Sequence, residues 1–242
     1  MASPPSSAAP PSHLLLDFFG TVVEYSPSRT TQRYQGTYEL TTTMGSALGY
    51  DESTEAWSTA FEGFEASTAA TLEEFSMHQV AHAALDAILG RPAAADEIQP
   101  AVEAYLTDWG QGIVYPAGML DVLRDLSATH TLAIVSNTHD ANLVQSHLSA
   151  MGVSELFATV VTSIDVGRRK PHPAIYAAAL ERLGIRPGEA LFVGDSLGPD
   201  YTGPESVGIA SFLIDPTSTA TVPAPRRLAS LGHLAGRLAN IT

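Results

Sequence analysis

The sequence contains no cysteine, which excludes disulfides and thiol chemistry. A zinc site would have to be built from histidine and carboxylate ligands alone. Apolar stretches are short, and none approaches the ~20 residues that a membrane-spanning helix needs. The segment MASPPSSAAPPS lacks the basic start and the apolar stretch of a secretory signal. We therefore expect a disordered lead at residues 1–12 and a cytoplasmic protein.

Positive charge is also scarce, since 12 Lys and Arg stand against 26 Asp and Glu, giving a formal net charge of −14. An acidic surface repels nucleic-acid phosphates and anionic lipid headgroups, so we expect neither nucleic acid nor a membrane as a partner. Lysine is the scarcest cation, because Lys170 stands alone beside eleven arginines. Lysine is a compact point charge that arginine does not imitate, so position 170 is a candidate for a specific task.

What the sequence does contain is 45% hydrophobic residues, gathered in short apolar runs that alternate with helical patterns. The first run starts at His13, and later runs cover residues 131–136, 158–162, 190–194 and 210–214. Helical patterns fall at residues 117–128, 140–151, 173–183 and near 201–207. This alternation predicts βαβ units, and therefore an α/β fold with a doubly wound parallel sheet.

The segment between the first and second runs does not follow this alternation. It is rich in Ala, Glu, Thr and Leu with helical spacing, so we expect an inserted all-helical cap domain at residues 24–112. The core would then comprise residues 13–23 and 113–220. Residues 221–242 are expected to form a C-terminal tail with a helix over residues 226–239.

Polar side chains occur where the predicted strands end. Asp17 closes the first strand, Ser136 and Asn137 the second, and Asp195 the fourth, with Asp200 five residues further on. A single Asp in such a position usually caps a turn or a helix. The carboxyl ends of parallel strands, however, lie at the same edge of a sheet and commonly bind ligands there. The set therefore predicts an active site.

Four segments together carry a family resemblance. They read DFFGT (residues 17–21), IVSN (134–137), RKPHP (169–173) and GDSLGPD (194–200). In this order they resemble the four motifs of the haloacid dehalogenase-like (HAD) hydrolase superfamily, and the helical insertion after the first motif resembles a C1 cap. The resemblance implies a HAD-like core sheet and a hydrolase active site at its edge.

The resemblance further implies a phosphatase that uses Mg²⁺ and acts on a small phosphate ester. Asp17 would attack phosphorus and carry the phosphoryl group as a covalent intermediate. Asp17, Asp195 and Asp200 would hold the ion, with the backbone carbonyl of Phe19 as a further ligand. Such an oxygen ligand set suits Mg²⁺.

The other matched residues would bind the phosphoryl group of the substrate. Lys170 would offset the negative charge, and Asp200 would orient it. Ser136 and the backbone amide of Asn137 would donate hydrogen bonds to phosphate oxygens, and Thr21 would belong to the same binding site. Fixed donors and cations of this kind stabilise the charge on the transferred group.

Phe19 departs from the family pattern. Most phosphatases of this superfamily have a second Asp at this position, and that Asp protonates the leaving group. A phenyl ring cannot transfer a proton, so efficient hydrolysis of alkyl phosphates is not expected. The metal site is unaffected, because a backbone carbonyl survives any change of side chain.

A metal-independent 2-haloacid dehalogenase is the main alternative. That branch resembles D-x-Y-G-T, from which Phe19 differs by a hydroxyl, and it has a tyrosine where Tyr176 stands. Arg29 or Arg33 in the cap could bind a halide or a substrate carboxylate. The branch lacks an acid at the position of Asp195, however, and an unneutralised carboxylate there would repel a departing halide. This charge argument favours phosphoryl chemistry.

Three further alternatives remain. A catalytically weakened HAD-like binding protein would explain Phe19. A serine esterase is suggested by G-x-S-x-G around Ser196, with Asp215 and His233 in triad order. It leaves Asp17 and Lys170 unexplained. A phosphonatase is disfavoured, because its chemistry resembles a Schiff base formed by a cap lysine, and the expected cap contains no lysine.

Overall fold

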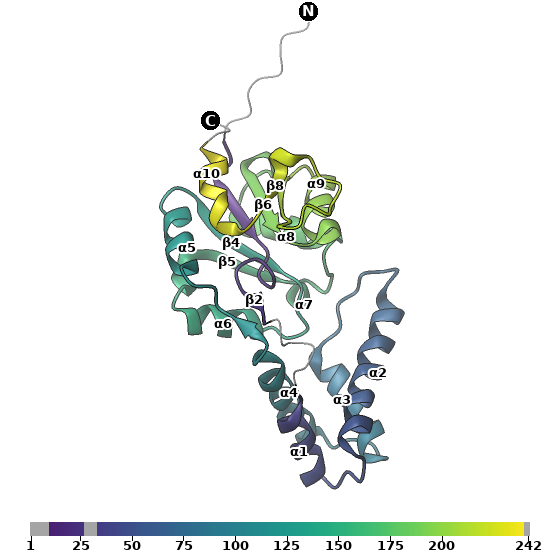
Figure 1. Ribbon diagram of the computed structural model, residues 1–242. Helices are drawn as coiled ribbons and strands as arrows, with labels where there is room; N and C mark the ends of the chain where they lie inside the picture. The colour runs from purple at the N-terminus through teal and green to yellow at the C-terminus, as the bar shows by residue number, and fades with distance from the viewer. Residues whose placement is uncertain (1–9, 27–32, 240–242) are drawn as a thin grey trace, which may run out of the picture. The chain divides into compact units, whose positions relative to one another are not determined.

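The computed structural model describes residues 10–26 and 33–239. The chain forms two compact units, which Figure 1 shows as a sheet-containing part and a helical part. The first unit combines the chain up to Glu24 with the chain from Tyr115 onward, and the second comprises Tyr25–Val114. We propose that the second unit is the cap expected at residues 24–112.

The first unit is built on a six-stranded sheet with the order β5-β4-β1-β6-β7-β8, in which all neighbouring strands are parallel. The strands are β1 (His13–Leu16), β4 (Thr131–Ser136), β5 (Phe157–Thr162), β6 (Ala190–Gly194), β7 (Ala210–Ile214) and β8 (Arg227–Leu228). In the centre, Leu16 of β1 lies opposite Ile134 on one side and Val193 on the other. The predicted α/β fold with a parallel sheet is confirmed.

Helices cover the sheet and bury its central strand. The helices of this unit are α5 (Met119–Ser127), α6 (Leu143–Met151), α7 (Ser163–Val166), α8 (Pro173–Leu183), α9 (Gly203–Ser206) and α10 (Leu234–Leu238). Tyr176 of α8 packs with Leu15 and Phe192 in one fully buried cluster. Leu14 and Leu16 point to the other face, because side chains alternate along a strand. They too are fully buried, so β1 is covered on both faces.

The tail differs from the prediction. The predicted helix over residues 226–239 is wrong in its first part, because helical structure starts only at the 3-10 turn Leu231–His233 and continues as helix α10 (Leu234–Leu238). Residues Arg227–Leu228 instead form β8, which extends the sheet beside β7, and Asp215 N donates to Leu228 O at 2.9 Å. Leu228 and Leu231 are buried. Pairing with an open sheet edge and burial of leucine here outweigh local helix propensity.

The second unit is helical, with α1 (Gln35–Thr43), α2 (Tyr50–Thr68), α3 (Met77–Leu89) and α4 (Ala95–Gly110). The short strands β2 (Glu24–Tyr25) and β3 (Ile113–Val114) pair with each other where the chain enters and leaves it. Helix α3 supplies the core, since Val80, Ala84 and Ile88 recur at helical spacing and pack with Trp57 of α2.

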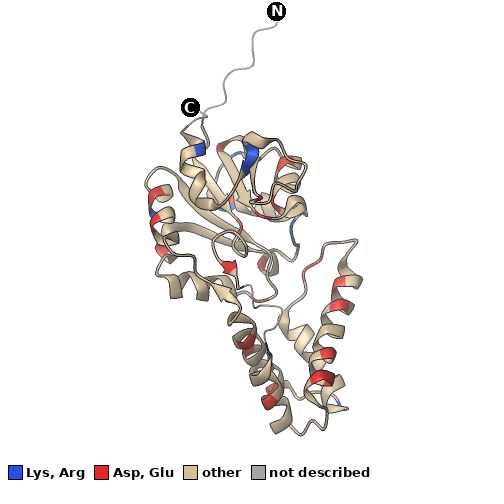
Figure 2. Cartoon of the chain, in the orientation of Figure 1, with Lys and Arg blue, Asp and Glu red and all other residues tan. Residues whose placement is uncertain are grey.

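Buried polar contacts also hold the helical unit together. Thr37 donates from both its backbone amide and its hydroxyl to Asp108 Oδ2, each at 2.8 Å, and so ties α1 to α4. Acidic residues are spread over the helices of this unit with few cations beside them (Figure 2). In the described parts of the chain, no helix is both long enough and apolar enough to cross a membrane.

Candidate active site

Three carboxylates meet at the carboxyl edge of the sheet. Asp17 directly follows β1, and its backbone amide donates to Val193 O at 2.9 Å, which continues the pairing with β6. Asp195 directly follows β6, and Asp200 lies in the next helical turn, Leu197–Thr202. One oxygen from each of the three carboxylates lies within 4.8 Å of the others.

Lys170 joins two of these carboxylates. Its Nζ lies 2.7 Å from Asp17 Oδ1 and 2.6 Å from Asp200 Oδ1, and the residue is 3% exposed. Burial works to lower the pKa of Lys170, but attraction to Asp17 and Asp200 outweighs it, so the pKa is raised and the ammonium stays charged. Three carboxylates and one ammonium leave an excess of negative charge at this edge.

Burial, together with this excess of negative charge, raises the pKa of two of the carboxylates. Burial is the largest cause that raises the pKa of Asp17 to about 7; Asp200 and Asp195 add to the effect, and Lys170 opposes it. The pKa of Asp195 is also raised, first by burial and then by repulsion from Asp200. A cation beside these oxygens would remove the repulsion and restore ionised carboxylates.

A tight loop after β1 allows Asp195 to approach. The carbonyl of Phe18 accepts hydrogen bonds from the amides of Val22 at 2.9 Å and Val23 at 3.1 Å, so the chain turns sharply. Gly20 has a φ of +89°, and a Cβ atom there would overlap the Asp195 carboxylate. Glycine is therefore required both by backbone conformation and by close contact.

Asp200 is fixed by its own loop. Ser196 N donates to Asp200 Oδ2 at 2.9 Å, and Asp200 N donates back to Ser196 O at 2.8 Å. A Cβ atom at Gly194 would overlap Asp200. Tyr176 is fully buried and donates its hydroxyl to Pro199 O at 2.5 Å, and its pKa is raised by burial and by Asp200. Tyr176 thus holds the loop that presents Asp200.

Asn137 has a role that the sequence did not reveal. Lys170 N donates to Asn137 Oδ1 at 2.7 Å, and Asn137 Nδ2 donates to Lys170 O at 3.1 Å. The side chain therefore clamps the backbone that carries the buried ammonium. We expected only the backbone amide of Asn137 to act, because nothing in the local pattern indicates a partner 33 residues away.

The other residues that the sequence predicted for the site do not all lie beside the carboxylates. Ser136 is fully buried at the end of β4, and Thr21 donates to Asp17 Oδ2 at 3.5 Å. The ring of Phe19 contacts His147, with 6.1 Å between ring centroids. Arg33 is exposed in the helical unit. Arg29 lies outside the described residues, so binding by either arginine stays a prediction.

The residues of the esterase alternative have separate local roles. Ser196 donates its hydroxyl to Asp195 Oδ1 at 3.4 Å. Asp215 accepts from the amides of Ala220 at 2.9 Å and Thr219 at 3.2 Å, and His233 pairs with a neighbouring serine. Within the described residues, no hydrogen bond links Ser196, Asp215 and His233, so the structure gives the esterase reading no support.

A family model for haloacid dehalogenase-like hydrolases matches residues 11–208. The chain therefore belongs to the haloacid dehalogenase-like hydrolase family. It is 42% identical over 109 residues to haloacid dehalogenase-like hydrolase domain-containing protein 3 of Mus musculus, covering 43% of each chain. It is 25% identical over 185 residues to a ribulose-1,5-bisphosphate 5-phosphatase of Halopiger xanaduensis, covering 74% of this chain and 77% of the relative. The chain spans about half the length of the first curated relatives it matches.

Solved structures share the fold across nearly the whole chain. A 2-haloacid dehalogenase from Pseudomonas syringae pv. Tomato DC3000 aligns with a TM-score of 0.73 at 20% identity, covering 96% of this chain and 100% of that one. A HAD phosphatase from Thermococcus onnurineus aligns with a TM-score of 0.65 at 24% identity, covering 94% and 97%. At these identities the likeness establishes the fold alone and does not separate the two chemistries.

Proposed function

We propose that the protein is a Mg²⁺-dependent phosphatase that acts on a small phosphate ester through an aspartyl-phosphate intermediate on Asp17. The observation that carries this proposal is the charge of the cluster: among the described residues, Lys170 is the one cation paired with it, against the carboxylates of Asp17, Asp195 and Asp200. A metal-independent dehalogenase would leave Asp195 uncompensated beside a departing halide. Relatives named as phosphatases add support.

The donor set fits a magnesium ion. Mg²⁺ prefers oxygen ligands and uses one or two carboxylates together with water. Asp17 and Asp195 would supply the two carboxylates, with the carbonyl of Phe19 as a further proposed ligand, and Asp200 would act through bound water. When bound, the ion would balance the carboxylates and polarise the phosphoryl oxygens.

The residues of the site have separate roles in the two steps of phosphate ester hydrolysis. A carboxylate oxygen of Asp17 attacks phosphorus, and the bond from phosphorus to the ester oxygen breaks, so the leaving group departs with the electron pair. Water then attacks the phosphorus of the aspartyl phosphate, which releases inorganic phosphate and regenerates Asp17. Lys170 offsets negative charge throughout, while Ser136 and the amide of Asn137 bind phosphate oxygens.

Mg²⁺ should raise the melting temperature of the wild-type protein, and Asp195→Asn should abolish the rise. A ligand that binds only the folded state stabilises it by about 2.7 kcal/mol at a hundredfold excess over its Kd. Differential scanning fluorimetry with EDTA and with Mg²⁺ measures the shift. Asp125→Asn is the matched control, because Asp125 is exposed on α5 and should leave the shift intact. No shift in the wild type would contradict the metal site and favour the dehalogenase alternative.

The effect of Mg²⁺ should depend on pH, because the pKa of Asp17 is raised to about 7 without metal. The folded state then holds a proton that the unfolded state releases near its ordinary pKa, so metal-free stability should fall as pH rises between about 4 and 7. The ion needs the ionised carboxylate, so its affinity should drop about tenfold per unit below about pH 7. Calorimetric Mg²⁺ titrations at about pH 6 and about pH 8 test this. Equal affinities would contradict the assignment of Asp17 as a ligand.

Catalysis is tested by a substrate screen with and without Mg²⁺. Phosphate release from acetyl phosphate or an aryl phosphate, lost with EDTA and in Asp17→Asn, is the expected result. Halide release from 2-haloacids without phosphate release would overturn the proposal. No turnover of any of these compounds would favour the binding-protein alternative.

A further inference from the structure

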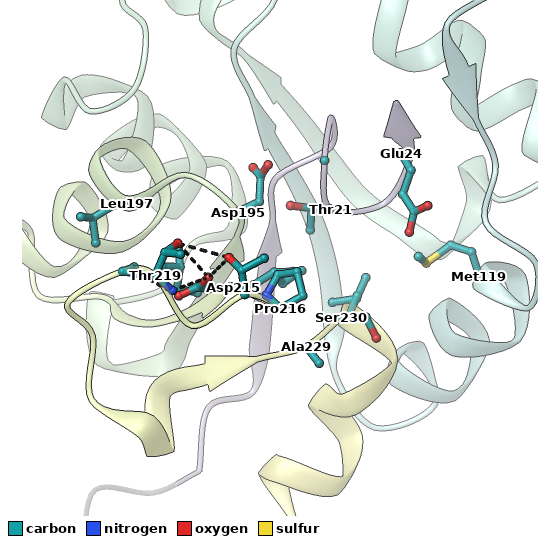
Figure 3. A pocket seen from close by; sticks show the side chains of 16 residues that line it. Thr21, Glu24, Met119, Asp195, Leu197, Asp215, Pro216, Thr219, Ala229 and Ser230 are labelled. Atoms are coloured by element: carbon teal, nitrogen blue, oxygen red, sulfur yellow. Dashed lines mark hydrogen bonds between the residues drawn. The ribbon is translucent and has the colours of Figure 1, made fainter. Parts of the chain in front are cut away.

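A pocket of about 520 Å³ adjoins the carboxylate cluster (Figure 3). It shares Gly20, Thr21 and Asp195 with the candidate active site. Its other walls come from the end of β7 and the turn that follows, and from residues 229–231 of the tail. All sixteen lining residues belong to the sheet-containing unit. The volume is that of a site for a small molecule.

The charge of the pocket disfavours a second anionic group on the substrate. None of the sixteen described residues that line it is Lys, Arg or His, whereas Glu24, Asp195 and Asp215 all contribute to its wall. Hydrogen bonds from the amides of Thr219 and Ala220 lower the pKa of Asp215, which therefore stays ionised. A second phosphate or a carboxylate placed here would meet repulsion without a compensating cation.

The remaining walls combine apolar residues with hydroxyl residues, and an uncharged group suits both. Met119, Leu213 and Leu231 contribute apolar side chains that are otherwise buried. Leu197 also lines the pocket and is 43% exposed, so part of its side chain is open to a bound molecule. An aromatic ring would cover the exposed part of the Leu197 side chain and remove it from water.

The chemistry at Phe19 indicates the same kind of molecule. Without an acid at this position, the leaving group must depart as a stable anion, and a phenolate does so far more readily than an alkoxide. We infer that the pocket receives the uncharged aromatic leaving group of an aryl monophosphate. This inference rests on the proposed phosphatase function and names the substrate class of the same site.

Filling the pocket tests the inference. Ala229 lines the pocket and is exposed, so Ala229→Trp should fold and occupy space that the ring would use. The measurement is kcat/KM for 4-nitrophenyl phosphate divided by that for acetyl phosphate, which has no ring. This ratio should fall about tenfold or more in Ala229→Trp, since burying one such ring accounts for at least a tenfold factor in binding. Ala224→Trp, an exposed alanine of the same tail outside the pocket, should keep the wild-type ratio.

A second variant guards against misfolding and tests the charge argument. Ser230→Lys places a cation at the pocket wall, and it should raise kcat/KM for an aryl phosphate with a para-carboxylate relative to the uncharged ester. An unchanged ratio in Ala229→Trp, together with no gain in Ser230→Lys, would overturn the inference while acetyl phosphate hydrolysis still supported the phosphatase. Failure of the wild type to hydrolyse either phosphate would instead remove the proposed function, and the inference with it.

Discussion

Wild-type protein should hydrolyse 4-nitrophenyl phosphate and hardly hydrolyse simple alkyl phosphates, and Phe19→Asp should raise the alkyl rate by about 10²–10⁴. A positioned general acid contributes a factor of this size when the leaving group is a poor anion. The gain should be much smaller for the nitrophenyl ester, because nitrophenolate departs without a proton. Steady-state kcat for both esters in Mg²⁺ measures the difference.

Phe19→Asn is the matched control for this variant. Asn has nearly the shape of Asp but cannot donate a carboxylic proton, so it separates the loss of the ring from the gain of the acid. The ring contacts Phe18 at 4.9 Å and His147 at 6.1 Å between centroids, and both variants lose these contacts. Equal wild-type rates on the two esters, with no gain in Phe19→Asp, would show that another group supplies the acid.

Lys170→Met should lower the free energy of unfolding of the metal-free protein by about 3–5 kcal/mol, the usual cost of removing one partner of a buried ion pair. The substitution leaves Asp17 and Asp200 buried beside each other without a counterion. Urea denaturation in EDTA at about pH 8, where carboxylates are normally ionised, gives the difference. Turnover should be lost as well, because the offset to the negative charge is gone.

Two further variants make the stability result specific. Adding Asp200→Asn to Lys170→Met should recover part of the lost stability, because one stranded charge is removed and the residues are coupled. Arg91→Met breaks the ion pair with Glu97, 2.7 Å long but on the surface, and should cost far less. A Lys170→Met variant as stable as the wild type would mean that the carboxylates take up protons at little cost.

Much of the core could be predicted from the sequence, because each of its strands corresponds to a short local run of apolar residues. Apolar runs of five or six residues between turns gave β4, β6 and β7 with their observed limits. Strands buried on both faces need such runs, and the alternating helices then require parallel pairing. The same local pattern predicted which polar residues stand at the ends of the strands.

Contacts between distant segments were not predicted. The sequence predicted a helix where β8 forms, because the residues of the tail do not indicate that the edge of β7 is available for pairing. The hydrogen bond from Tyr176 to Pro199 likewise joins residues 23 positions apart. A polar side chain can bond to many different groups, and tertiary packing decides which of them lies within reach. Sequence periodicity therefore does not predict such hydrogen bonds.

The sequence by itself determined the parallel sheet and the edge at which Asp17 and Asp195 emerge, and it made the lone Lys170 a candidate for the same site. These depend on local apolar runs and on residue identity. Only the tertiary structure decided that Lys170 bridges Asp17 and Asp200 in a buried ion triad, and that a pocket without cations opens beside Asp195. The physical reason is that burial and proximity arise only when β1, β6, β7, the tail and the loop before α8 that carries Lys170 pack together. Charge balance and cavity shape are properties of that assembly and of no single segment.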